Sequence, residues 1–322
     1  MSTGQSERIE PVATSTPVDE AAVATAGTRG QLVLRRLLRD KLALAGGIIL
    51  ILLFLGAFLS PLIYPYDYRT QSDADLLLAP SPQHWFGTTK LGEDVFAQCM
   101  RGLQKSLLIG LLVAVISTGV ASVVGAAAGY FGKATDKVLM WFVDLLLVLP
   151  SFLIVAIASQ SPAIRGHSWL LLVLLLSAFG WMITSRIVRG MTLTLREREY
   201  VLAAKFMGMP AWRIIATHIL PNMASLLIID ATVGVGVAIL SETSLSFFGF
   251  GVQPPDVSLG TLIATGTDSA LTFTWLFCFP AGLLVLTVMA VNLLGDGLRD
   301  ALDPSSSRSR ARSRARRRKG RR

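Results

Sequence analysis

The sequence predicts an all-α membrane protein with six transmembrane helices and both chain termini on the cytoplasmic side. Three observations predict this class. Of 322 residues, 52% are hydrophobic and 16% charged, which is unusual for a soluble domain. Six apolar runs are long enough to cross a bilayer, which takes about 20 helical residues. Loops rich in Lys and Arg alternate with loops that hold few, and such basic loops stay in the cytoplasm.

The six predicted spans end where polar residues or turn signals interrupt the apolar runs. Backbone groups in lipid have to bond to one another, and runs of this length favour helices over the strands of a barrel. We expect Gly and Pro to interrupt the chain at the ends of spans and not within them. The predicted spans are residues 42–63, 106–128, 138–158, 169–187, 223–247 and 272–294.

Two polar tails flank this domain. The first 28 residues are rich in Ser, Thr, Ala, Pro and Glu, which predicts a disordered cytoplasmic tail at 1–34 and no signal peptide. The transmembrane domain then covers 35–304. Ten of the lysines and arginines lie at 308–322, so the net charge of +9 belongs to a basic cytoplasmic tail at 305–322.

The basic tail fits three interpretations. It could be a solvated segment that reinforces the topology, an anchor for anionic lipid headgroups, or a nucleic-acid-binding segment. No aromatic residue lies between its basic residues to stack on bases. We therefore expect membrane lipid as a partner and no nucleic acid.

The distribution of basic residues sets the orientation. The side that carries the termini also carries the loop between the fourth and fifth spans. Its basic residues are Arg35, Arg36, Arg39, Lys41, Lys133, Lys137, Arg186, Arg189, Arg196, Arg198, Lys205, Arg213 and Arg299. The opposite side holds Arg69, Lys90, Arg101, Lys105 and Arg165. The protein is thus predicted to be a multi-pass protein of the cell membrane.

Two outer segments are long enough to form a cap. The first runs from about residue 64 to residue 105, and its Gly87 and Gly92 predict turns that fold residues 84–95 back against the membrane. The second, 249–271, is dense in Gly and Pro and predicts an irregular structure.

The cytoplasmic loop at 196–222 contains a segment, residues 199–222, that we call the elbow. Its first part is built from helix formers, with Glu199 in the first turn where the helix dipole favours negative charge. Gly208 can end this helix in the left-handed conformation, and Pro210 suits the start of a second one. The result is a helix–Gly–helix knob, with Ala203 and Ala204 on one side, which a soluble partner can grip.

Three acids fall within predicted spans: Asp144, Asp230 and Glu242. An acid at mid-span costs about 2.5–3.5 kcal/mol on insertion scales, so such residues face the protein interior. They are candidates for the substrate pathway or for hydrogen bonds from a neighbouring helix. Asp230 and Glu242 lie about 120° apart on a helix and do not form one ligand pair.

The chain lacks the motifs of an enzyme. A phosphate-binding loop would need Gly at Ala127 and a hydroxyl residue at Ala134, next to Gly132 and Lys133. The two cysteines and three histidines have no metal-site spacing. We expect no catalytic residue, no metal and no cofactor in this chain, so any ATP and its Mg²⁺ would be bound by a partner.

The elbow resembles the EAA loop of permease subunits of ABC importers. The matching residues are Glu199, Ala203, Ala204, Gly208, Ile219, Leu220, Pro221 and Asn222. Residues 84–95, 242–255 and 292–304 are similar to motifs of the dipeptide/oligopeptide/nickel permeases, in the same order. The resemblance covers about 35–304 and is greatest to the "C" permease of the dipeptide/oligopeptide group.

This resemblance implies a type I ABC importer permease fold and a set of partners. These are a second homologous permease, one or two ABC ATPase subunits and an extracytoplasmic substrate-binding protein. The elbow would be the coupling segment, with the ATPase contacted by Glu199, Ala203, Ala204, Lys205, Gly208 and Met209. The transported substrate would be a short peptide, and nickel chelates or glutathione-like compounds stay open.

Two residues depart from the family pattern: Glu93 replaces a frequent Arg and Leu259 a frequent Trp. Both are expected on the outer side, where they would alter contacts with the binding protein. A different class, an ion-coupled secondary carrier, should show paired broken helices in mid-membrane. A membrane sensor should carry a soluble signalling domain.

Overall fold

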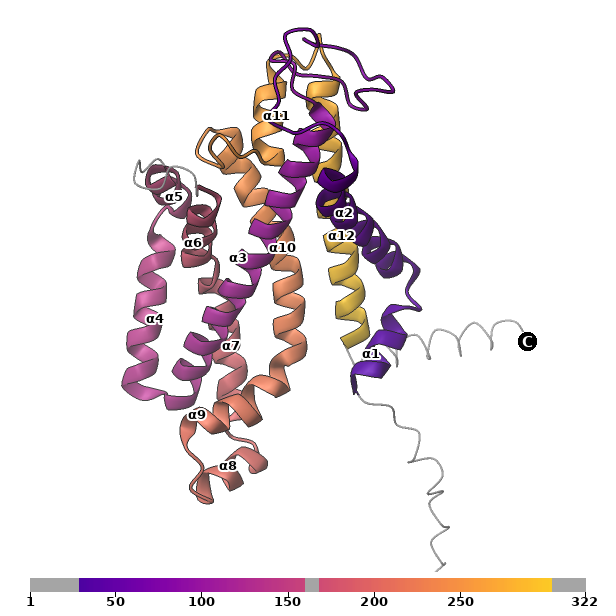
Figure 1. Ribbon diagram of the computed structural model, residues 1–322. Coiled ribbons are helices and arrows are strands. Elements are labelled where there is room, and N and C mark those ends of the chain that lie inside the picture. Colours follow the sequence, from indigo (N-terminus) through magenta and orange to yellow (C-terminus); the bar gives the residue numbers. More distant parts are fainter. Residues whose placement is uncertain (1–28, 160–167, 303–322) are drawn as a thin grey trace, which may run out of the picture.

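The computed structural model describes residues 29–159 and 168–302, and the regular elements of these ranges are helices (Figure 1). They are α1 (Arg29–Leu37), α2 (Lys41–Ile63), α3 (Val95–Phe131), α4 (Lys133–Val148), α5 (Ser151–Ser159), α6 (Ser168–Gly180), α7 (Met182–Leu195), α8 (Glu199–Phe206), α9 (Ala211–Ile214), α10 (Ala224–Phe247), α11 (Leu259–Thr267) and α12 (Trp275–Leu302). A π turn, Ile215–Ile219, and a 3-10 turn, Leu220–Met223, join α9 to α10.

Four to six segments of the described chain can cross a membrane by length and composition. Four are continuous: α2, α3, Ala211–Phe247 and α12. Two more are bent pairs, α4 with α5 at 73° and α6 with α7 at 43°. The predicted all-α membrane protein is thus confirmed, and each predicted span has a helix or a bent pair at its place in the sequence.

The expectation that Gly and Pro interrupt only the ends of spans is wrong. The first bent pair breaks at Leu149 and Pro150, inside the predicted span 138–158. Leu149 is extended, with φ −70° and ψ 135°, because the ring of a following proline disfavours the helical conformation. The second pair breaks at Trp181, after Gly180. The breaks alone therefore do not exclude a carrier.

The second span begins earlier than predicted. It starts at Val95 and not at 106, because the polar residues between these positions lie on a helix that extends beyond the apolar run. Asp94 caps it: the carboxylate accepts a hydrogen bond from the backbone N–H of Ala97 at 2.8 Å. The extra turns include Gln98, Arg101 and Lys105.

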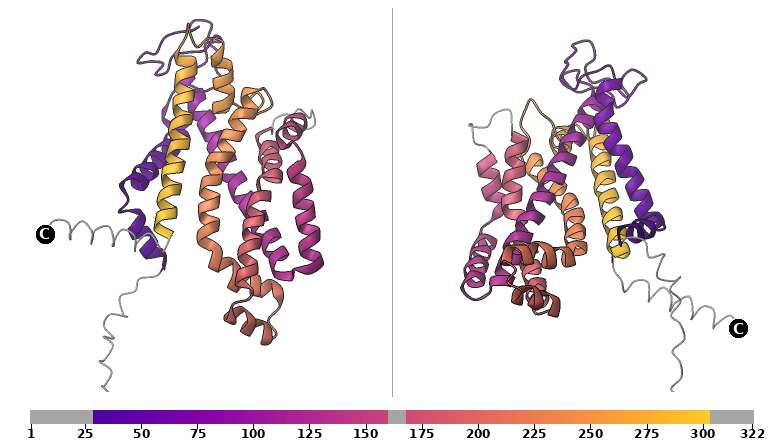
Figure 2. Two further views of the ribbon diagram at one scale, coloured as in Figure 1. Left: turned by 180° about the vertical axis from the view of Figure 1, so that it is seen from behind. Right: turned by 60° about the horizontal axis from the view of Figure 1, so that its bottom comes forward.

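Helix α3 lies at the centre of the bundle and contacts α2, α4, α6, α7 and α10 (Figures 1 and 2). Its approach to α7 depends on Gly125 and Gly129, one turn apart. A Cβ atom at Gly125 would lie 2.8 Å from the Cβ of Val188, and one at Gly129 2.7 Å from the Cβ of Thr192. Small residues at this spacing let membrane helices approach closely and gain van der Waals contact.

The two ends of the bundle differ in what they carry. Helices α8 and α9, α1 and the C-terminal end of α12 lie toward one end, which we call the elbow end (Figure 1). Residues 64–94 and α11 lie at the other, which we call the loop end (Figure 1). Residues 29–34, predicted to be disordered, belong to α1, where Arg36 donates to the carbonyl of Ala301 at 3.4 Å. The rest of the predicted N-terminal tail, 1–28, and the whole predicted C-terminal tail, 305–322, lie outside the described residues.

The loop end is more regular than predicted. Gly87 and Gly92 have φ values of +76° and +74°, and Thr88 forms a bridge with Asp94, so the predicted turns are confirmed. The second segment contains helix α11 where an irregular cap was expected. Ser258 and Thr261 start this helix with reciprocal side-chain hydrogen bonds, a capping box that the sequence reasoning overlooked.

Candidate functional site

The elbow has the helix–Gly–helix form that the sequence predicts. Helix α8 ends at Phe206, and Gly208 follows with φ +78°, a conformation that glycine adopts without steric cost. The N–H of Gly208 donates to the carbonyl of Lys205 at 3.0 Å, and that of Met209 to Ala204 at 3.1 Å. Pro210 is extended and starts α9. The turn is therefore closed by backbone hydrogen bonds and needs no partner to form.

One face of the elbow is fixed to the bundle by apolar packing. Val201 and Ala204 of α8 are 1% exposed, and Ile214 and Ile219 are fully buried. They form one cluster with Ala126 of α3, Val188 of α7 and Met223. Ala204 is therefore part of the interior of this chain, whereas the sequence reasoning placed it on the face that a partner contacts.

Other residues of the elbow expose large apolar side chains. Phe206 is 87% exposed, Met207 76% and Trp212 70%. Aromatic and methionine side chains are enriched where proteins bind one another, and contiguous exposed apolar groups mark such sites. The sequence reasoning missed these three residues, although two aromatic residues and a methionine beside a glycine turn were a readable signal.

The other predicted contact residues lie around these side chains. Glu199, Ala203, Lys205 and Gly208 are exposed, and Met209 is half-buried. Five of the six predicted residues are thus accessible at the elbow end.

Glu242 is fully buried in α10 and bonds only to hydroxyl groups within the described residues. Its carboxylate accepts from Ser106 of α3 at 3.1 Å and from Ser246 at 2.6 Å. Ser258, the cap of α11, bonds in turn to Ser246 at 3.2 Å. The carboxyl group therefore joins three helices at the loop end.

Asp230 lies half-buried in the first third of α10, between two other helices. It accepts from Thr118 of α3 at 3.0 Å and from Thr184 of α7 at 2.9 Å. It has no partner in common with Glu242 in the described chain, as expected for residues on different sides of a helix.

Asp144 forms an ion pair with Arg186 that links α4 to α7, and about half of each side chain is exposed. The neighbouring pair of Asp136 and Arg189 links the same helices. The three predicted acids are therefore separate structural positions with different partners and do not meet at one site.

A second polar centre lies at the loop end, and sequence reasoning missed it. Asp256 accepts from Lys105 at 2.9 Å and from Arg101 at 2.7 and 3.1 Å. The ammonium of Lys105 also lies 4.2 Å from the ring centre of Trp169. Burial alone would raise the pKa of Asp256, but the hydrogen bonds from Lys105 and Arg101 outweigh it and hold that pKa below its usual range.

A third polar cluster links residues 64–94 to α3. Asp94 lies 2.8 Å from Nδ1 of His84 and accepts from the hydroxyl of Tyr64 at 2.9 Å. His84 and Asp94 are both buried. Leu259, expected to alter outer contacts, is also fully buried, so its replacement of Trp concerns internal packing and not a surface contact.

Comparisons with known proteins agree with this architecture. Residues 121–308 match the family described as the binding-protein-dependent transport system inner membrane component. Residues 28–80 match the N-terminal TM domain of oligopeptide transport permease C. The chain is 56% identical over 279 residues to the oligopeptide transport system permease protein OppC of Mycobacterium tuberculosis. The aligned region covers 87% of this chain and 96% of the relative.

More distant relatives have related names. The dipeptide transport system permease protein DppC of Bacillus subtilis is 39% identical over 85% of both chains. A putative peptide permease protein of Brucella suis is 38% identical over 84% of this chain and 89% of its own length. With more than half of its length matched by the family model, this chain belongs to the family of inner-membrane components of binding-protein-dependent transport systems.

Proposed function

We propose that this chain is the membrane-spanning subunit of an ATP-driven importer of short peptides and forms half of its translocation pathway. Family membership supports the transport role, and the printed names of the relatives support the peptide substrate. A nickel-chelate or glutathione-type substrate has no such support among these relatives. An ion-coupled carrier is not favoured, because the family works with a separate binding protein.

The assembly contains six spans in this chain, with each bent pair counted as one, and a second homologous permease. The termini and the elbow face the cytoplasm, and the loop end faces the extracytoplasmic binding protein. The excess of Lys and Arg at the elbow end supports this orientation. The basic tail contacts anionic lipid headgroups. The complex does not bind nucleic acid.

The elbow is the contact point for an ATPase subunit that binds ATP and Mg²⁺. The observation that carries this proposal is the exposure of Phe206, Met207 and Trp212, three large apolar side chains that flank the turn at Gly208 in the sequence. One face of the elbow packs on α3 and α7, so a push on the elbow moves the helices that it touches. Closure of the ATPase would in this way change the side of the membrane to which the translocation pathway opens.

Co-purification in mild detergent tests the assembly. The full chain should bring down a second permease and an ATPase, and a strain without this chain should lose uptake of labelled di- and oligopeptides. A chain that purifies alone from cells that import peptides through it would end the proposal. Gly208→Pro should abolish both ATPase recruitment and transport, because proline cannot adopt the positive φ of this position.

A further inference from the structure

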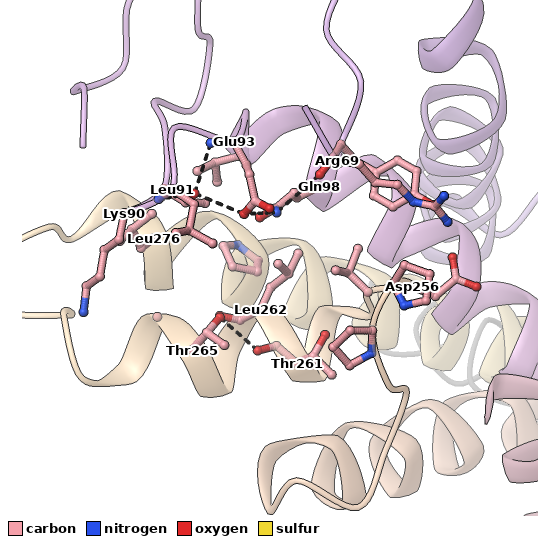
Figure 3. A pocket seen from close by; sticks show the side chains of 18 of the residues that line it. Arg69, Lys90, Leu91, Glu93, Gln98, Asp256, Thr261, Leu262, Thr265 and Leu276 are labelled. Atoms are coloured by element: carbon pink, nitrogen blue, oxygen red, sulfur yellow. Dashed lines mark hydrogen bonds between the residues drawn. The ribbon is translucent and has the colours of Figure 1, made fainter. Parts of the chain in front are cut away.

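A cavity of about 630 Å³ opens at the loop end, between residues 64–94, α11 and the start of α12 (Figure 3). This volume lies within the range of about 300–1,000 Å³ that small-molecule sites occupy. Much of its wall is apolar, with Val95, Val252, Pro255, Leu262, Leu276 and Pro280 among the lining residues. A few charged side chains also line the cavity, and their positions determine which kind of ligand it can bind.

Glu93 is the acid of the cavity that no cation neutralises. Its carboxylate accepts hydrogen bonds from Gln98 at 2.9 Å, Thr89 at 3.2 Å and Gln71 at 3.3 Å, all neutral donors. Within the described chain it forms no ion pair, whereas Asp256, the other acid of the lining, is held by Lys105 and Arg101. The side chains of Glu93 and Gln98 meet over the cavity (Figure 3).

Two cations flank the cavity at opposite ends, Lys90 and Arg69 (Figure 3). Both are exposed, and neither forms an ion pair with an acid in the described part of the chain. The guanidinium of Arg69 lies 4.9 Å from the ring centre of Tyr68, which leaves its hydrogen-bond donors available. The site thus offers one negative group between two positive groups, above an apolar wall.

We propose that this cavity binds a short peptide with free termini: its ammonium group on Glu93, its terminal carboxylate on Lys90 or Arg69, and an apolar side chain against the wall. Each charged end meets a group of opposite sign, and charge-assisted hydrogen bonds of this kind are the strong ones. The inference rests on the proposed peptide substrate and adds a recognition site in the permease itself, apart from the binding protein.

Direct binding of tritiated leucyl-alanine to the full chain, purified in detergent without a binding protein, tests the site. The unlabelled dipeptide should compete about tenfold better or more than N-acetyl-leucyl-alanine or leucyl-alanine amide, since each derivative loses one charge-assisted contact. Glu93→Gln keeps the size of the side chain and should remove the preference for a free ammonium group. Lys90→Gln combined with Arg69→Gln should remove the preference for a free carboxylate.

Asp73→Asn is the matched control, because Asp73 is an exposed acid of the same loop that does not line the cavity. It should leave affinity and preference unchanged, and thermal unfolding should verify that all variants are folded. Equal binding by the wild type and Glu93→Gln would overturn the inference, as would absence of saturable binding, the result expected if the cavity receives a binding-protein segment. Peptide uptake by the assembled complex is measured in parallel. Uptake without peptide binding to this chain would refute the proposed site and leave the proposed function standing. Peptide binding without uptake would refute the proposed function.

Discussion

The loop end and the elbow end differ in whether their side chains find partners within this chain. At the loop end, polar groups meet inside the chain: Lys105 with Asp256, and His84 with Asp94, all well buried. At the elbow end, Phe206 and Trp212 project away from the protein with most of their surface uncovered. Burial of apolar area stabilises an assembly by about 25 cal/mol per Å², so the uncovered face gains most from a partner.

This difference separates what the chain does alone from what it does in a complex. The loop end keeps its shape through internal ion pairs and hydrogen bonds and can hold a cavity without help. The elbow has a closed turn and a packed inner face, yet its outer face is incomplete. Variants at the two ends should therefore have different effects: loss of stability at the first and loss of association at the second.

The largest expected effect is at the outer face of the elbow. Phe206→Asp combined with Trp212→Asp should weaken ATPase association by about 1,000-fold or more, because buried aromatic anchors contribute about 2 kcal/mol or more each. Co-purification and peptide uptake measure this. The control is Leu76→Asp, at an exposed apolar residue of the loop end, which should retain both. Unchanged ATPase association in the double variant would refute the assignment of this face.

The buried ion pair of the loop end should give the next largest effect. Asp256→Ala leaves Lys105, with a side chain only 8% exposed, without its partner, and removal of one member of a buried pair costs about 3–5 kcal/mol. Thermal unfolding in detergent measures this loss. A melting temperature equal to that of the wild type would mean that Lys105 finds another partner.

Substitution of Glu242 should give the next largest effect, a smaller loss of stability than Asp256→Ala. Glu242→Ala would leave the hydroxyls of Ser106 and Ser246 without their acceptor and open a cavity, a cost of about 2–4 kcal/mol. Glu242→Gln keeps an acceptor of the same size and should retain most of the stability. If both variants unfold at one temperature, the hydrogen bonds to the serines contribute nothing to stability.

Acid should weaken the loop end through Asp256. The folded protein holds the pKa of this carboxyl below its ordinary value of about 4, so its contribution is present above that pH and is lost as the pH falls through the folded pKa. Hydrogen exchange of residues 249–258 should rise in this acidic window. Asp256→Asn should remove this pH dependence, and an identical profile in that variant would assign it to another group.

The smallest effect is expected at the exposed pair. Asp144→Ala breaks an ion pair whose side chains are about half exposed, and such pairs contribute about 0–1 kcal/mol. Thermal unfolding should detect little change, in contrast with Asp256→Ala. A loss of the same size as at Asp256 would mean that the α4–α7 contact depends on this charge.

Much of the fold could be predicted from the sequence, because a span needs a long apolar run and a turn needs a permissive residue. The positive φ values of Gly87, Gly92 and Gly208 follow from the same logic. The break at Pro150 was readable as well, since a proline inside an apolar run disfavours helix on its N-terminal side. The start of α3 was not, because its first turns are polar and face other parts of the protein.

The candidate site was only partly predictable. The position of the elbow follows from helix formers and Gly208, but which of its faces turns outward depends on the packing against α3 and α7. Ala204 therefore looked accessible in the sequence and is buried in the structure, while Phe206 and Trp212 are exposed. Likewise, nothing local in the chain pairs Lys105 with Asp256.

The sequence by itself determined the membrane class, the order of the spans and the elbow, because these depend on local composition and on the demand of lipid for bonded backbone groups. Only the tertiary structure decided which acids are partnered, which face of the elbow is uncovered and where the cavity lies. These depend on contacts between residues far apart in the chain, whose geometry is set by how the helices pack.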